Sequence, residues 1–221
     1  MGDIKVSSKS KVSQIKKAAP AQTLRKRNRG STENKLIKAG IEIFSKYGFD
    51  AATTKLISKR SNVNESLIMR YFGGKEGLLI EIIRRFLERF QTTPLSYPPQ
   101  ASLEAELVHF CRQSFEDIKK NTAVMRIMML RSAVDPKMKK KVLSLINSDG
   151  NPRLIERIQV LKEKNKLPAN FDPMLIHLIA FQNISAIFIS DILFEDDKQI
   201  EIEKNLERIV SLTVKGIMQK N

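Results

Sequence analysis

The sequence TTKLISKRSNVNESLIMRYFGGKEGLL, residues 53–79, decides how the N-terminal part of the chain folds. It opens with Thr53 and Thr54, residues of a type that caps helices, and apolar side chains follow at helical spacing. Ser-Asn-Val at 61–63 interrupts the pattern, and Asn62 tolerates the positive φ of a tight turn. Asn64 caps a further helix, expected over 65–72. Two short helices joined by a tight turn make a helix-turn-helix.

The second of these helices presents a polar face. Glu65, Ser66, Met69 and Arg70 share one side at helical spacing, while Ile68 points elsewhere. A helix of this kind can enter a DNA groove and read base edges. Carboxylates accept from cytosine, arginine donates to guanine or phosphate, and apolar side chains touch thymine methyls. The residues expected to face bases are Asn64, Glu65 (cytosine), Ser66, Leu67 (thymine methyl), Met69 and Arg70 (guanine or phosphate).

Two further helices flank the helix-turn-helix. Ser31 precedes apolar residues spaced three to four apart, which predicts a helix from Ser31 to Tyr47. Gly48 supplies the left-handed residue that ends it. The apolar stripe over 76–91 predicts a connecting helix. Phosphate contacts are expected from the residues around the reading helix, namely Thr53, Thr54, Tyr71 and Lys75.

The spacing of these residues resembles the DNA-binding domain of the tetracycline-repressor (TetR) family of bacterial regulators. Thirteen positions agree in register without a gap: Phe44, Gly48, Phe49, Thr53, Thr54, Val63, Ile68, Arg70, Tyr71, Phe72, Lys75, Glu76 and Leu78. The family's small residue before the reading helix is Asn64 here, and its aromatic residue before the arginine is Met69. That aromatic residue commonly touches a phosphate in the family, so the resemblance implies one polar contact fewer at Met69.

The distribution of charge favours a nucleic-acid partner independently of this resemblance. The chain of 221 residues has a formal net charge of +15, and its first 30 residues carry nine lysines and arginines against one aspartate. Basic arms neutralise phosphates and can enter a minor groove beside a reading helix. Contact is expected from the cluster of Arg25, Arg27 and Arg29. For residues 1–20, a solvated tail and a DNA-contacting arm fit the composition equally well.

The remainder of the chain predicts an all-α fold in two parts. Three prolines in residues 92–100 mark a boundary, and helices are expected over 102–120, 122–133, 136–147, 152–165, 173–194 and 199–218. The domains are then a basic, disordered arm over 1–30, a helix-turn-helix domain with its connecting helix over 31–91, and a larger C-terminal helical domain for ligand binding and dimerisation over 92–221.

The segment 173–194 is apolar nearly all round, which favours a buried helix. The resemblance implies that this helix and the last helix pair with the same helices of a second copy to form a homodimer, which would bind a near-palindromic operator. The alternative is that both helices belong to the core of a single chain. The resemblance also implies a pocket for a small apolar or amphipathic effector, lined by Phe110, Phe115, Met125, Met128 and Met129. Such a stripe on a helix is usually plain core, which is the alternative.

The sequence does not support catalysis, a cofactor, a metal site or membrane insertion. It lacks a phosphate-binding glycine loop and a nucleophile motif, and His109 and Cys111 lie on different faces of one helix. Polar residues within 174–194 make a membrane span costly, and no secretory signal is evident, so a cytoplasmic protein is expected. Three functions stay open: an effector-released repressor, an effector-independent DNA-binding regulator, and a non-specific basic nucleoid-type protein.

Overall fold

A computed structural model of the chain describes residues 21–146, 150–168, 171 and 198–218, and the described residues contain helices and no strand. This agrees with the all-α fold predicted from the sequence. The helices, in chain order, are α1 (Ala21–Ala51), α2 (Thr54–Ser61), α3 (Ser66–Phe72), α4 (Lys75–Thr92), α5 (Leu103–Lys119), α6 (Thr122–Val134), α7 (Pro136–Leu145), α8 (Pro152–Glu163) and α10 (Lys198–Met218).

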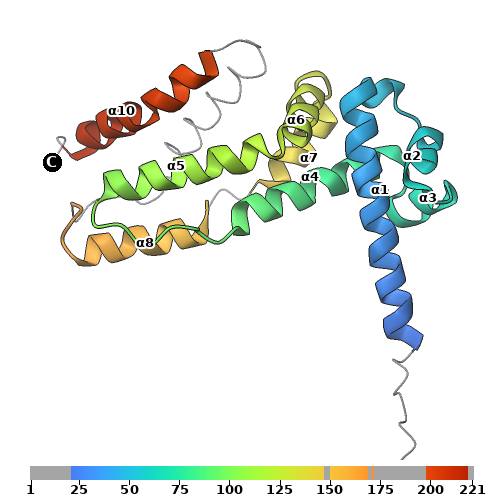
Figure 1. Ribbon diagram of the computed structural model, residues 1–221, viewed down its shortest axis with the longest axis horizontal. Helices are drawn as coiled ribbons and strands as arrows, with labels where there is room; N and C mark the ends of the chain where they lie inside the picture. The colour runs from blue at the N-terminus through green and yellow to red at the C-terminus, as the bar shows by residue number, and fades with distance from the viewer. Residues whose placement is uncertain (1–20, 147–149, 169–170, 172–197, 219–221) are drawn as a thin grey trace, which may run out of the picture.

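The helices form two groups linked by α4 (Figure 1). The short helices α2 and α3 lie together beside α1, and α4 leads from them towards α5 and α8. Helices α6 and α7 lie near the C-terminal half of α1, while α10 packs on α5. The N-terminal part of α1 projects beyond α2 and α3. The predicted helix over 173–194 lies outside the described residues.

The first helix begins earlier than the sequence analysis predicted. It starts at Ala21, so Ser31 lies inside the helix and is not its cap, and residues 21–30 are helical. The prediction of a disordered arm is therefore wrong for its last ten residues. The reason lies in their composition, because alanine, glutamine, leucine, lysine and arginine are strong helix formers and extending a helix costs less than starting one. Residues 1–20 lie outside the described residues.

Gly48 interrupts α1 as predicted. Its backbone adopts φ 73° and ψ 170°, a combination that is essentially restricted to glycine, and the helix kinks there. A Cβ atom added at Gly48 would meet no other atom within 4 Å, so the constraint is one of backbone conformation alone.

Replacing Gly48 with alanine is expected to lower the free energy of unfolding by about 1–3 kcal/mol, because the side chain forces a strained φ. Gly30 provides a matched control, since it lies in the helical part of the same element with open space around it. There the same substitution is expected to raise stability by about 0.5–1 kcal/mol. Urea unfolding of both variants measures the difference, and equal effects at the two positions would contradict this reading of the kink.

Two hydrophobic clusters stabilise the protein. The N-terminal core contains buried residues of the helix-turn-helix segment and also of α6 and α7: Leu36, Phe44, Ile57, Ile68, Leu78, Leu79, Ile83, Val124, Ile127, Met128, Met138 and Val142 are among them. The C-terminal core joins α5, α8 and α10 through residues that include Leu107, Phe110, Phe115, Leu154, Ile158, Leu206 and Val210. The half-buried side chain of Met125 packs against both.

The N-terminal core crosses the boundary at residue 92 that the prolines predicted. The prolines do end α4, but α6 and α7, which follow α5 in the chain, pack back onto α1 and α4. Because this packing is long-range, the hydrophobic pattern of each helix could not reveal it. The division into domains at that boundary remains a prediction.

A buried ion pair fastens the proline-containing loop to the C-terminal core. The carboxylate of Glu106 is fully buried in α5 and lies 3.0 Å from the guanidinium of Arg157 in α8. Arg157 also donates to the carbonyl of Tyr97 at 2.8 Å, and the backbone N–H of Gln100 donates to Glu106 at 2.8 Å. Burial raises the pKa of Tyr97, so its hydroxyl stays protonated and donates to the carbonyl of Glu106 at 3.3 Å. These contacts hold the loop in a defined position between α4 and α5.

Candidate nucleic-acid interface

The turn between α2 and α3 has the geometry that the sequence predicted. Thr53 caps α2, its hydroxyl accepting from the backbone N–H of Leu56 at 3.2 Å. Asn62 ends the helix in the left-handed region with φ 53° and ψ 42°. The hydroxyl of Ser58 then donates to the carbonyl of Val63 at 2.6 Å and holds the turn closed. These local bonds set the relative orientation of the two short helices.

Asn64 organises the start of α3, which begins at Ser66, one residue later than predicted. Its side-chain oxygen accepts from the backbone N–H of Ser66 at 2.9 Å and from the hydroxyl of the same residue at 2.8 Å. The N-cap position itself is Glu65, one residue after the predicted Asn64, and the Glu65 side chain makes no capping hydrogen bond. Gly73, with φ 73°, ends the helix in the left-handed region.

Helix α3 is buried on one side and exposed on the other. Ile68 is fully buried in the N-terminal core, and Leu67 is half-buried against it. The opposite face is exposed, with 66% of Met69 accessible to solvent. The exposed residues of the predicted reading face are Asn64, Glu65, Ser66, Met69 and Arg70. The structure therefore brings this set together on one surface, with Leu67 at its edge.

Arg29 joins the N-terminal extension of α1 to the end of the reading helix. Its guanidinium lies 5.0 Å from the ring centre of Tyr71, and its Nε donates to the carboxylate of Glu33 at 2.7 Å. This hydrogen bond raises the pKa of Arg29. The side chains of Arg25 and Arg27 lie outside the described residues, although their backbone belongs to α1. Arg29 and Tyr71, both predicted to contact phosphate, are thus neighbours in space.

Lys75 occupies a position that the sequence did not predict. Its ammonium donates to the carbonyls of Phe49 at 2.8 Å, Asp50 at 3.3 Å and Ala52 at 2.9 Å. It also lies 4.4 Å from the ring centre of Phe49. An ammonium has three donors, and all three have backbone acceptors here. In this geometry Lys75 holds the segment between α1 and α2. Its contact with a DNA phosphate stays a prediction, and the three hydrogen bonds disfavour it because they occupy the donors of the ammonium.

A second cation, not predicted from the sequence, lies against the same ring. The guanidinium of Arg131 lies 4.5 Å from the centre of the Phe49 ring. Arg131 belongs to α6, which packs back onto α1. Arg131 also pairs with Asp50 at 3.4 Å and with Asp135 at 2.9 Å. No local signal could have found this contact, because Arg131 and Asp50 lie 81 residues apart in the sequence.

Comparison with known proteins places this geometry in a family. The family model for bacterial regulatory proteins of the tetR family matches residues 36–82, which include both short helices and the turn. The segment 36–82 is thus similar to the TetR family of bacterial regulators. The matched segment ends within α4, so the helices that follow it are assigned to no family by this match.

Two curated proteins are similar to this chain in sequence. The HTH-type transcriptional regulator BetI of Vibrio parahaemolyticus is 41% identical over 58 residues, which cover 26% of this chain and 29% of that protein. The chain thus matches less than a third of that relative's length. The HTH-type transcriptional regulator YvkB of Bacillus subtilis is 24% identical over 191 residues, covering 84% of this chain and 97% of YvkB.

A solved structure agrees with the fold of this chain over most of its length. The transcriptional regulator FadR of Bacillus subtilis, determined in complex with stearoyl-CoA, superposes with a TM-score of 0.64. The match covers 83% of this chain and 98% of FadR at 16% sequence identity. At this identity the likeness concerns the fold alone, including the helices beyond the matched family segment.

The predicted ligand residues lie in the hydrophobic cores of the protein. Phe110 and Phe115 are buried in the C-terminal core, Met128 is buried in the N-terminal core, and Met125 and Met129 are half-buried. Their role as a ligand lining stays a prediction. A groove of about 440 Å³ lies elsewhere, between α5 and the loop that begins at Thr93, and none of the five lines it.

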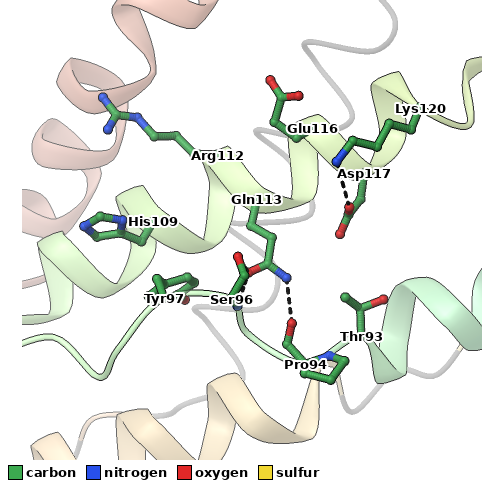
Figure 2. A pocket seen from close by; sticks show the side chains of 10 residues that line it. All are labelled: Thr93, Pro94, Ser96, Tyr97, His109, Arg112, Gln113, Glu116, Asp117 and Lys120. Carbon is green, nitrogen blue, oxygen red and sulfur yellow. Dashed lines mark hydrogen bonds and ion pairs between the residues drawn. The ribbon is translucent and has the colours of Figure 1, made fainter.

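The side chains around this groove are largely bonded to the protein itself (Figure 2). Gln113 accepts from the backbone N–H of Ser96 at 2.7 Å and donates to the carbonyl of Pro94 at 2.9 Å. Arg112 pairs with Glu207 of α10, and Lys120 lies 4.0 Å from Asp117. The groove thus marks where the loop is fastened to α5.

Three further features of the described part of the chain concern metal binding, thiol chemistry and membrane insertion. There, no three histidine, cysteine, aspartate or glutamate side chains gather as metal ligands would. Burial raises the pKa of Cys111 to about 12, so its thiol is protonated and unreactive near neutral pH. Among the same residues, no helix combines the length and apolarity required to cross a bilayer. His177 and the apolar segment 174–194 lie outside the described residues.

Proposed function

We propose that this protein is a sequence-specific DNA-binding transcriptional regulator. The observation that carries the proposal is the exposed face of α3, where Glu65, Ser66, Met69 and Arg70 lie on the surface while Ile68 anchors the opposite side in the core. A polar, rigidly supported helix face after a tight turn is the arrangement that reads base edges in a major groove. The basic N-terminal residues add affinity for phosphates without adding specificity.

The protein acts as a homodimer on a near-palindromic operator. One helix of seven residues reads few base pairs, so two copies related by a two-fold axis are required for a useful site length. In α10, Val210 is buried against the C-terminal core, while Ile209 and Leu212 remain 39% and 63% exposed. These apolar side chains supply part of a surface for the second copy. A regulator of this kind works in the cytoplasm, where its operator lies.

The regulator is a repressor that a small amphipathic effector releases. Support comes from α6, which carries Met125 and Met128 towards the two cores and Arg131 to the ring of Phe49. A ligand that displaced α6 would therefore act on the helix-turn-helix segment through direct contacts. It would do so by binding one of two conformations of the protein more tightly than the other. The complex of FadR with stearoyl-CoA indicates that this fold can hold an amphipathic ligand. Phe110, Phe115 and Met129 are the further candidates for its lining.

Two alternatives remain distinct from this proposal. An effector-independent regulator would use the same reading face under the control of its abundance or of a protein partner. A non-specific basic DNA-binding protein is favoured by one observation, the concentration of nine lysines and arginines in the first 30 residues. Base preference separates this last alternative from the other two, because phosphate contacts carry no sequence information.

Fluorescence anisotropy on duplexes that tile the DNA upstream of the protein's own gene tests the proposal. We expect tight binding to one near-palindromic tile that survives scrambled competitor and higher salt. Equal, steeply salt-dependent binding to a set of random duplexes and to every tile would instead indicate the non-specific alternative. Acyl-CoA is then added to the complex of protein and DNA. Release of the DNA indicates a repressor that responds to this class of ligand, and unchanged binding indicates a regulator that does not respond to it.

Replacing Arg70 with alanine is expected to weaken binding to the preferred tile about 10-fold or more and to relax base preference at one position, because a bidentate arginine contact contributes about 1–3 kcal/mol. Arg126, exposed on α6, is the control, and its replacement by alanine is expected to leave affinity within about twofold. Unchanged affinity and base preference in the Arg70 variant would show that α3 does not read DNA through this residue.

A further inference from the structure

Thr54 and Glu65 are joined by a short hydrogen bond across the helix-turn-helix. The hydroxyl of Thr54, the first residue of α2, donates to Oε1 of Glu65 at 2.5 Å. Glu65 is exposed and immediately precedes α3, and eleven residues separate the pair in the sequence. Hydrogen bonds from a hydroxyl to a carboxylate at this distance belong to the stronger, charge-assisted class. The bond thus links the start of one short helix to the reading face of the other.

This bond changes the role expected of Thr54. A hydroxyl has a single proton to donate, and a contact to a phosphate oxygen requires that proton. In the structure the proton is already given to Glu65, whose negative charge also repels a phosphate placed beside it. Thr54 is therefore poorly suited to the phosphate contact that its position in the sequence predicted. Thr53 differs, because its hydroxyl oxygen accepts from the backbone of α2 and keeps its own proton free of Glu65.

The bond also limits what Glu65 can do. A free glutamate side chain samples many rotamers, and fixing it on DNA costs conformational entropy. With Oε1 held by Thr54, the carboxylate is oriented before DNA arrives, and Oε2 is left to accept from a donor outside the protein. Asn64 is fixed in the same way by its two hydrogen bonds to Ser66, so the polar residues leading into α3 are organised as a group. Because these side chains are already ordered in the free protein, less conformational entropy is lost when they bind a base.

We propose that Thr54 is a positioning residue for base recognition, which holds the Glu65 carboxylate so that its second oxygen accepts from the amino group of a cytosine. The inference rests on the proposed function and adds to it the base class read at one position and the residue that sets it. In the major groove a cytosine presents its N4 amino group as a donor, and a carboxylate is its matching acceptor. Thymine and guanine present acceptor oxygens at the equivalent edge and are repelled.

The experiment is a selection of bound sequences from a library of duplexes with a randomised central region, carried out with the unaltered chain and five variants. Thr54→Val removes the hydroxyl with little change of shape, and Thr54→Ser keeps it. Glu65→Gln replaces the acceptor carboxylate, and the double variant Thr54→Val/Glu65→Gln tests whether the two residues act together. Thr53→Val is the matched control, since it alters the neighbouring hydroxyl that does not touch Glu65. Circular dichroism melting shows that each variant is folded.

We expect Thr54→Val and Glu65→Gln to reduce the preference for cytosine at the same position of each half-site, by about 5- to 20-fold, while preferences elsewhere persist. The double variant loses no more there than either single variant, and Thr54→Ser retains the preference. Thr53→Val lowers affinity for all sequences alike. A uniform loss of affinity in Thr54→Val, with cytosine preference kept, would overturn the proposal and return Thr54 to phosphate binding.

Two other outcomes separate the inference from the function beneath it. If the unaltered chain enriches no recurring sequence, the proposed function fails, and the inference fails with it. If the unaltered chain enriches a palindrome but Glu65→Gln alters a position that Thr54→Val leaves intact, the regulator stands and the positioning role of Thr54 is wrong.

Discussion

Replacing Arg157 with methionine is expected to lower the free energy of unfolding by about 3–5 kcal/mol, because it leaves the Glu106 carboxylate buried without its counter-charge. Glu106 is fully buried and its Oε1 lies 3.0 Å from the guanidinium, whereas the side chain of Arg157 retains 19% exposure. The substitution also removes the hydrogen bond to the Tyr97 carbonyl and the guanidinium that lies 4.7 Å from the centre of the Tyr97 ring.

Urea unfolding followed by circular dichroism measures this loss. The ion pair of Arg112 with Glu207 is the matched control, because its side chains are 56% and 57% exposed. Arg112→Met is expected to change stability by less than about 1 kcal/mol. Removing both buried charges with Glu106→Leu and Arg157→Met is expected to recover much of the loss, since well-packed apolar pairs often match a buried ion pair. If Arg157→Met and Arg112→Met lowered the free energy of unfolding equally, burial of the Glu106–Arg157 pair would not be what makes its loss destabilising.

Replacing Lys75 with methionine is expected to lower the free energy of unfolding by about 2–3 kcal/mol, because three backbone carbonyls lose a charged donor. The ammonium bonds to the carbonyls of Phe49, Asp50 and Ala52 and lies over the Phe49 ring. Methionine keeps an unbranched apolar side chain that is one atom shorter, and it lacks the charge and the three donated protons. The segment between α1 and α2 then loses its anchor, and the reading helices lose their fixed orientation.

The same variant distinguishes two roles for Lys75. Removing a lysine that anchors this segment lowers stability, whereas removing a lysine that binds phosphate lowers the salt dependence of DNA affinity by about one counterion. We expect a loss of stability with the slope of log affinity against log salt unchanged. Lys55, exposed in α2, is the control, and Lys55→Met is expected to leave stability within about 0.5 kcal/mol. A stable Lys75→Met protein with a reduced salt slope would restore the phosphate role.

The reading head was predictable because its signals are local. Thr53 caps α2, Asn64 accepts from the first residue of α3, and Asn62 and Gly48 have the positive φ that the turns require. Each of these features depends on a residue's own backbone preference or on a partner within a few positions. The exposed face of α3 followed from the same spacing, because residues three and four apart share one side of a helix.

The start of α1 was not predictable from the same kind of signal. Ser31 has the appearance of a cap, but capping residues also occur inside helices when the preceding residues favour helix formation. Continuing the helix from Ala21 satisfies the N–H groups that a cap would otherwise serve. The summed helix propensity of residues 21–30 therefore outweighed the capping preference of Ser31.

The sequence by itself determined the all-α fold, the helix-turn-helix and the face of α3 that points outward, because these depend on interactions within one or two helical turns. Only the tertiary structure decided how the parts are held together. Arg131 reaches Phe49 and Asp50 from α6, Arg157 reaches Glu106 and Tyr97 from α8, and Thr54 reaches Glu65 across the turn. Each of these contacts joins residues from separate elements, and the pairing of such side chains is fixed by how the helices pack, which the pattern of any single helix does not specify.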